Sequence, residues 1–151
     1  MTTTAFQLFD SGEAVEEAGA SNFFAVYPND TLVTPPLSGT ILPGITRDSI
    51  ILLARNECGM TVLEQRLPIS ELQNASEAFC CGTGASITPV GRVRVTGKDD
   101  DSGGMDIVFG DGEAVGPQTK RLQKLLLDIQ MGTASEELNK KYEKWMHIVH
   151  G

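Results

Sequence analysis

The sequence lacks several features that would place it in a specialised class of protein. It has no apolar run of the roughly 18 residues that a membrane-spanning helix needs. Its first residues have no basic stretch followed by an apolar one, as a secretory signal has, and they are acidic where an organelle transit peptide is rich in arginine. Basic residues are in deficit, and the formal net charge of −8 argues against nucleic acid or an anionic membrane surface as a partner.

Cysteine and histidine are also scarce. The three cysteines are Cys58, Cys80 and Cys81. Neither their number nor their spacing predicts a disulfide framework or a zinc site, so we expect free thiols in a reducing compartment. His147 and His150 lie in the last five residues, where we expect no catalytic role. The aspartates of residues 99–104 do not have EF-hand spacing, and we expect a solvated loop there and no metal.

What is present is typical of one globular domain of mixed α and β structure. The chain has 151 residues, 40% of them hydrophobic and 21% charged, which suits a single domain over residues 1–151. Patterns typical of strands occupy residues 5–9, 22–27, 31–34, 60–67, 77–81 and 86–96. Helices are predicted from about Thr46 to Gly59, from a cap at Ser70, from Pro117 to Gly132, and from Ser135 onward. The polar, glycine-rich residues 97–116 predict a mobile loop.

Two short segments have a form that suits a bound anion. Residues 43–49 (PGITRDS) run from a loop straight into a helix, whose first N–H groups and positive dipole end attract phosphate. The same pattern is equally typical of a simple helix start capped by Thr46. Residues 82–86 (GTGAS) form a turn of small side chains between two predicted strands, which lets a backbone approach a ligand closely, although most such turns are merely tight.

Four segments in order resemble one known family, the class IV aminotransferases, and within it the branched-chain amino-acid aminotransferases. They are VEEAGASNFF (15–24), LVTPPLSGTILPGITRDSI (32–50), AFCCGTGASITPV (78–90) and GPQTKRLQKLLLDIQMG (116–132), with WMHIV (145–149) near the end. The resemblance covers nearly everything from about Phe6 onward. Four motifs in the family's order are far more specific than any single one.

This resemblance implies a fold, a cofactor and a reaction. The family has a small N-terminal domain and a larger α/β pseudo-barrel domain, with pyridoxal 5′-phosphate between them, and this chain corresponds to most of the large domain. The implied reaction converts leucine, isoleucine or valine with 2-oxoglutarate into branched 2-oxo acids and glutamate. The resemblance also implies a homodimer for the full-length parent.

The resemblance also assigns roles to individual residues. The carboxylate five positions before Asn22 is Glu17, which would face the pyridine nitrogen of the cofactor and favour its protonated form. Without the motif, Glu16 and Glu17 would read as a solvated charged pair. The cofactor phosphate would bind the N–H groups of Ile45 and Thr46 and the hydroxyl of Thr83. The substrate carboxylate would bind the N–H groups of Gly84 and Ala85.

The sequence also departs from the family pattern. The lysine that forms the Schiff base lies roughly 35 residues before the Glu17 position in the family. The first lysine here is Lys98, in the wrong segment, so we expect the catalytic lysine upstream of this chain and no transamination by the chain alone. Ala20 replaces a threonine that many branched-chain enzymes have, which would remove a hydroxyl near the substrate, and Gly84 replaces an alanine, which would loosen the turn at the substrate carboxylate.

Two other functions fit the same sequence. One is a different class IV reaction, either D-amino-acid transamination or aminodeoxychorismate cleavage, since a shared fold does not fix the reaction. The other is a non-catalytic short isoform or partner subunit, which would associate through apolar surface that the small domain normally covers. The sequence predicts a soluble intracellular protein and leaves open the cytosol, the mitochondrion and the plastid.

Overall fold

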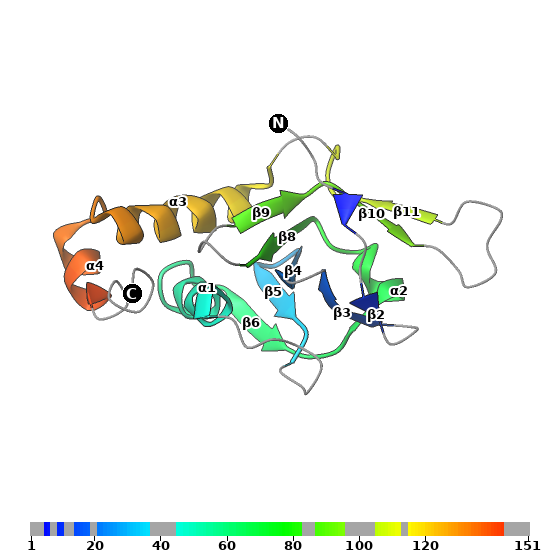
Figure 1. The fold of residues 1–151 in the computed structure, drawn as a ribbon, viewed down its shortest axis with the longest axis horizontal. Helices are drawn as coiled ribbons and strands as arrows, with labels where there is room; N and C mark the ends of the chain where they lie inside the picture. Colours follow the sequence, from blue (N-terminus) through cyan, green and yellow to red (C-terminus); the bar gives the residue numbers. More distant parts are fainter. Residues whose placement is uncertain are drawn as a thin grey trace.

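The computed structural model describes residues 5–6, 9–10, 14–18, 21–36, 45–82, 87–95, 105–112 and 115–143. They form a small sheet, a larger sheet and four helices (Figure 1). The small sheet has the order β1-β10-β11, with β1 (Ala5–Phe6), β10 (Arg92–Val95) and β11 (Met105–Val108). The helices are α1 (Ile45–Asn56), α2 (Ile69–Leu72), α3 (Pro117–Met131) and α4 (Glu136–Lys141).

The larger sheet is organised around one central strand. Its eight strands are β2 (Phe9–Asp10), β3 (Ala14–Ala18), β4 (Ser21–Tyr27), β5 (Thr31–Thr34), β6 (Thr61–Glu64), β7 (Leu67–Pro68), β8 (Glu77–Cys81) and β9 (Ile87–Val90). β4 pairs with β8 over most of its length, and it also pairs with β3 near its start and with β5 near its end. β3 and β5 therefore diverge from β4, and the sheet opens between them.

Local sequence explains the elements that were predicted well. The hairpin of β4 and β5 turns at Asn29 and Asp30, whose φ angles of 68° and 54° are left-handed values that short polar side chains tolerate. α3 begins with Pro117 at its first position and ends at Gly132, with φ of 71°, as predicted. Ser135 caps α4 as predicted, because its side chain accepts a hydrogen bond from the Leu138 N–H.

Five local predictions are wrong in detail. Residues 60–67 are not one strand, since β6 pairs with β5 whereas β7 pairs with β3. Residues 5–9 are not one strand, since β1 and β2 belong to different sheets. Residues 86–96 are broken at Gly91, where the chain passes from β9 in one sheet to β10 in the other. Ser70 does not cap α2, whose cap residue is Pro68, so Ser70 lies inside that helix. Residues 105–108 of the predicted loop 97–116 form β11, because Ile107 is buried there in the second core.

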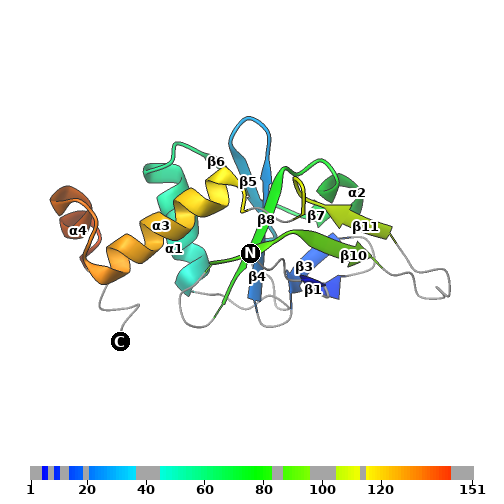
Figure 2. The same ribbon diagram turned by 90° about the horizontal axis from the view of Figure 1, so that it is seen from above.

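Two hydrophobic cores cover the two faces of the larger sheet. The first core joins α1 and α3 to the sheet through Phe24, Leu53 and Leu122, and the rings of Phe24 and Phe79 stack with centroids 4.9 Å apart. The second core lies between the sheet and the β10–β11 side and includes Phe23, Val93 and Ile107. Figure 2 shows α1 and α3 together on one side of β4 and β8, with β10, β11 and α2 on the other.

A helix that crosses a membrane has to be both long and apolar. Among the described residues, no helix is both long enough and apolar enough to cross a bilayer.

Candidate functional site

One row of residues crosses four strands at a single end of the larger sheet. Glu17 of β3 is paired with Asn22 of β4, which is paired in turn with Cys81 of β8. Cys81 is also paired with Ile87, the first residue of β9. Glu17 and Cys81 are therefore two strand spacings apart, roughly 10 Å. Strand register alone therefore brings Glu17 close to Cys81, the last residue of β8.

The start of α1 lies at the same edge. β5 and β6 are parallel, with Thr34 opposite Glu64, and the chain returns between them through α1. The first turn of α1 consequently lies beyond the carboxyl ends of both strands, which is where ligands bind in open α/β sheets. The Thr34 hydroxyl donates a hydrogen bond of 2.7 Å to the Phe23 carbonyl, and this fixes the end of β5 beside Asn22.

The first turn of α1 offers donors that suit a phosphate. The N–H groups of Ile45 and Thr46 belong to the first two positions of the helix, which have no acceptor within it. The positive end of the helix dipole is at the same place. Thr46 is partly buried. This donor set fits an anionic group that reaches the edge defined by Glu17 and Cys81.

Arg47 is the most unusual side chain in this region. It is only 1% exposed and is among the largest fully buried side chains of the described residues. One terminal nitrogen donates to the Pro35 carbonyl at 3.0 Å and to Glu64 Oε1 at 3.0 Å. Its Nε atom is buried and has no hydrogen-bond partner among the described residues. A buried guanidinium therefore joins the segment after β5 to the end of β6.

The two cysteines of β8 are not reactive in this environment. Burial raises the pKa of the Cys81 thiol to about 12, and the positive charge of Arg47 offsets only part of that rise. Burial also raises the pKa of Cys80 far above its usual range. Both thiols are therefore protonated at neutral pH. The cysteines are free, as predicted, and Cys80 and Cys81 pack into opposite cores.

The structure brings some of the predicted site residues together and leaves others outside the described part. Glu17 lies in the row described above, although only its backbone is described, and Ile45 and Thr46 begin α1. Thr83, Gly84 and Ala85 lie outside the described residues. The sequence prediction did not include Arg47. Its signal was a single arginine in the first turn of a helix, where the dipole disfavours a cation.

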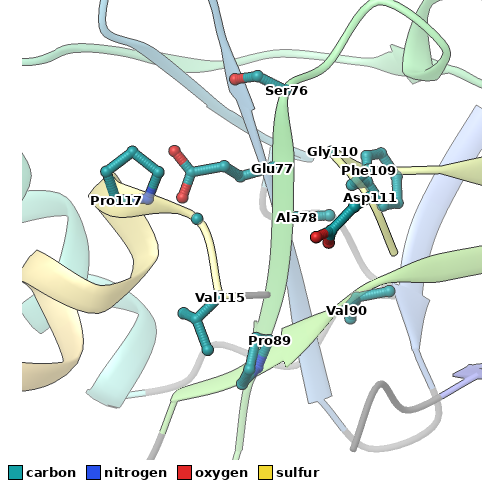
Figure 3. Close-up of a pocket in the computed structure, with 11 residues that line it drawn as sticks. Ser76, Glu77, Ala78, Pro89, Val90, Phe109, Gly110, Asp111, Val115 and Pro117 are labelled. Carbon is teal, nitrogen blue, oxygen red and sulfur yellow. The ribbon is translucent and has the colours of Figure 1, made fainter. Parts of the chain in front are cut away.

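The opposite end of the larger sheet has a cavity that is lined by carboxylates. A cavity of about 380 Å³ lies there between the start of β8 and the start of α3 (Figure 3). The Glu77 carboxylate points at α3 and accepts hydrogen bonds from the N–H groups of Gln118 at 3.2 Å and Thr119 at 2.8 Å. Asp111 lines the same cavity. With two carboxylates in its wall, this cavity does not suit an anion.

Side chains that commonly bind metal ions are dispersed in the described part of the chain. Within those residues, no three side chains of histidine, cysteine, aspartate or glutamate gather closely enough to hold an ion.

A family model described as amino-transferase class IV matches residues 5–93. This span includes the Glu17 row, the start of α1 and the segment 82–86.

Curated relatives extend the match toward the C-terminus. The chain is 40% identical over 131 residues to the branched-chain-amino-acid transaminase 1 of Bacillus subtilis, covering 83% of this chain and 34% of that protein. It is 41% identical over 127 residues to the mitochondrial branched-chain-amino-acid aminotransferase 1 of Arabidopsis thaliana, covering 84% of this chain and 30% of that protein. The chain thus spans about a third of the length of these relatives.

Solved structures agree with the sequence relatives. The branched-chain amino acid aminotransferase of Escherichia coli is 38% identical, with a TM-score of 0.68 over 87% of this chain and 38% of that one. The enzyme of Thermobaculum terrenum, solved in its PLP form, is 33% identical, with a TM-score of 0.66 over 85% of this chain and 38% of that one. These likenesses confirm the predicted mixed α/β fold class.

Proposed function

The chain belongs to the class IV aminotransferases, and from this premise we propose that it carries the cofactor-phosphate end of a branched-chain amino-acid transaminase. The proposed reaction of the intact enzyme transfers the amino group of leucine, isoleucine or valine to 2-oxoglutarate, which yields a branched 2-oxo acid and glutamate. The branched-chain names of the relatives support this substrate class.

One observation carries the proposal. The strand register and the β5-α1-β6 connection bring Glu17, Cys81 and the first turn of α1 to the same edge of the sheet, which supports the proposal. A carboxylate and a set of phosphate donors at one edge match the two ends of pyridoxal 5′-phosphate. The buried charge of Arg47 beside these donors is a further feature that suits a phosphate.

The residues of this chain then have distinct tasks. When bound, pyridoxal phosphate supplies a ring that withdraws electrons from the substrate Cα. The Glu17 carboxylate holds a proton on the pyridine nitrogen, because a nearby negative charge favours the cationic ring. The N–H groups of Ile45 and Thr46 and the Thr83 hydroxyl hold the phosphate. The N–H groups of Gly84 and Ala85 orient the substrate carboxylate.

Proton transfer at the substrate needs a base that this chain does not contain. Its first lysine is Lys98, which follows β10 in the sequence, and the resemblance expects the lysine before Glu17. We therefore propose that the chain binds cofactor and does not transaminate unless another polypeptide segment provides the lysine. A homodimer is the proposed assembly of the intact enzyme.

Two assays test this proposal. The pure chain should show no exchange between leucine and 2-oxoglutarate. The same chain, joined to the part of the Bacillus subtilis protein that the match does not cover, should use leucine, isoleucine and valine. Exchange by the pure chain would contradict the assignment of the base. Activity of the joined protein on D-alanine or on aminodeoxychorismate alone would contradict the substrate class.

A further inference from the structure

The position of Arg47 is electrostatically unfavourable unless an anion compensates it. It is the third residue of α1, where the helix dipole is positive, and a cation there is normally destabilising. Its burial removes the solvation that a guanidinium has in water. A charge held in such a place needs a counter-charge.

The carboxylates near Arg47 do not fully supply this counter-charge. Glu64 Oε1 lies 3.0 Å from Arg47, but the Glu64 side chain is 39% exposed, so water screens part of its charge. Asp48 is 3.6 Å from Arg47 and its side chain is 72% exposed, so water screens its charge. Cys81, on the sheet side, is protonated and neutral. Both carboxylates are therefore open to water, whereas the Arg47 guanidinium is enclosed.

The Nε atom of Arg47 also lacks an acceptor in the described part of the chain. It is buried without a partner among the described residues, whereas a terminal nitrogen of the same side chain has two acceptors. A buried donor without an acceptor is costly, and a ligand oxygen is one way of satisfying it. This donor, the enclosed charge of Arg47 and the first-turn N–H groups of α1 are three features of one small region that favour an anion.

We infer that Arg47 is a positioning residue of the phosphate site, which anchors the first turn of α1 to Pro35 and supplies buried positive charge that Glu64 limits. This inference rests on the proposed function, because it takes the cofactor phosphate as the anion. The anchor and the charge have separable consequences. The Pro35 contact fixes where the α1 donors point, and the charge sets how strongly they attract a phosphate dianion.

The test measures binding of pyridoxamine 5′-phosphate to the whole chain by calorimetry, with pyridoxamine as the matched ligand without phosphate. Neither ligand carries an aldehyde, so neither forms adducts with surface lysines. Arg47→Met should weaken binding of the phosphate ligand by about tenfold or more, and Arg47→Lys should recover part of that loss because it keeps the charge. Binding of pyridoxamine should not change.

Glu64→Gln gives a result that a purely structural role of Arg47 would not produce. Removing the counter-charge should tighten binding of pyridoxamine 5′-phosphate by about threefold or more at low salt, and the gain should shrink as salt rises. Arg55→Met is the matched control, since Arg55 is half-exposed and faces the same Glu64. It should change affinity by less than about twofold.

Each outcome decides between the inference and the proposed function. If the wild-type chain binds pyridoxamine 5′-phosphate no better than pyridoxamine, the phosphate site itself is wrong. If the wild type prefers the phosphate ligand but Arg47→Met and Glu64→Gln leave that preference unchanged, the inference about Arg47 is wrong and the site stands. Should Arg47→Met fail to fold, as judged by circular dichroism, Arg47→Lys and Glu64→Gln decide the question. Unchanged or weaker binding by a folded Glu64→Gln overturns the inference.

Discussion

The helices α1 and α3 begin at opposite ends of the larger sheet, and their first turns meet opposite charges. At α3, the N–H groups of Gln118 and Thr119 are bound by the carboxylate of Glu77. At α1, the buried side chain in the first turn is Arg47, and it contacts Pro35 and Glu64 instead of the N–H groups of its own turn.

The difference separates a helix start that the protein satisfies by itself from one that suits an external anion. Glu77 performs at α3 the task that a bound phosphate would perform at α1, since both give negative charge and acceptors to free N–H groups. A helix N-terminus alone therefore does not predict a ligand site. The charge and the acceptors that surround it decide whether a ligand is needed.

The largest effect is expected where α3 approaches Glu77. A Cβ atom on Gly116 would collide with the side chain of Glu77, which is buried and held by two hydrogen bonds. Gly116→Ala should lower the free energy of unfolding by about 2–3 kcal/mol, measured by urea denaturation. Gly132→Ala is the control at the other end of α3. There φ is 71°, and an added Cβ atom would have no atom within 4 Å. This variant should lose only about 1 kcal/mol of the free energy of unfolding. Equal losses at both glycines would refute the close packing around Glu77.

Loss of the Glu77 carboxylate should have the second largest effect on stability. Glu77→Ala leaves the N–H groups of Gln118 and Thr119 without their acceptor, which should reduce the free energy of unfolding by about 2 kcal/mol. Glu77→Gln keeps one acceptor oxygen and should lose about half as much. Denaturation midpoints of the two variants check this order. If both variants match the wild type, α3 does not depend on its internal carboxylate.

A carboxylate away from both helix starts provides a smaller, pH-dependent effect. Hydrogen bonds from Lys141 and then Tyr142 lower the pKa of Glu57 below its usual 4.5. Because the folded value is the lower one, the stabilisation is complete above pH 4.5 and is lost as the pH falls through the folded pKa. Glu57→Gln should be less stable than wild type by about 0.5–1 kcal/mol at pH 7, since the pair lies near the surface.

The pH dependence of this variant has a clear sign. The difference between wild type and Glu57→Gln should stay constant from pH 7 to about pH 5 and shrink toward pH 3. Thermal melting at each pH measures it. A difference that grows on acidification would show that the folded pKa is raised and not lowered.

The smallest expected effect on stability converts α1 into a helix start like α3. Thr46→Asp places a carboxylate in the first turn, which should raise the free energy of unfolding by about 0.3–1 kcal/mol. The same carboxylate should repel a phosphate and weaken binding of pyridoxamine 5′-phosphate by about tenfold or more. Thr46→Asn, a neutral side chain of similar size, is the control and should bind more tightly than the aspartate variant. Equal binding by both would mean that the phosphate lies elsewhere.

Local patterns in the sequence predicted the elements whose causes are local. The turn at Asn29 and Asp30, the limits of α3 at Pro117 and Gly132, and the Ser135 cap all follow from side-chain chemistry within a few residues. The break at Gly91 could not be predicted in this way, because β9 and β10 look like one alternating run. They separate only because their partners lie in two different sheets.

The candidate site likewise contains residues that local motifs indicate and one residue that depends on tertiary contacts. The roles of Glu17, Ile45 and Thr46 are predictions from contiguous motifs that resemble a known family. Arg47 follows Thr46 directly, yet its burial depends on Pro35 and on Glu64, which reach it only after β5, α1 and β6 have packed. A side chain whose role comes from tertiary contacts leaves little trace in a local pattern.

The most direct test of the account is to map pyridoxamine 5′-phosphate onto the backbone amides of this 16.2 kDa chain by NMR titration. The account predicts that the amide signals of Ile45 and Thr46 shift as the ligand binds, while those of Gln118 and Thr119 stay in place because Glu77 already occupies that helix start. Saturable shifts at Gln118 and Thr119, with none at Ile45 and Thr46, would contradict it.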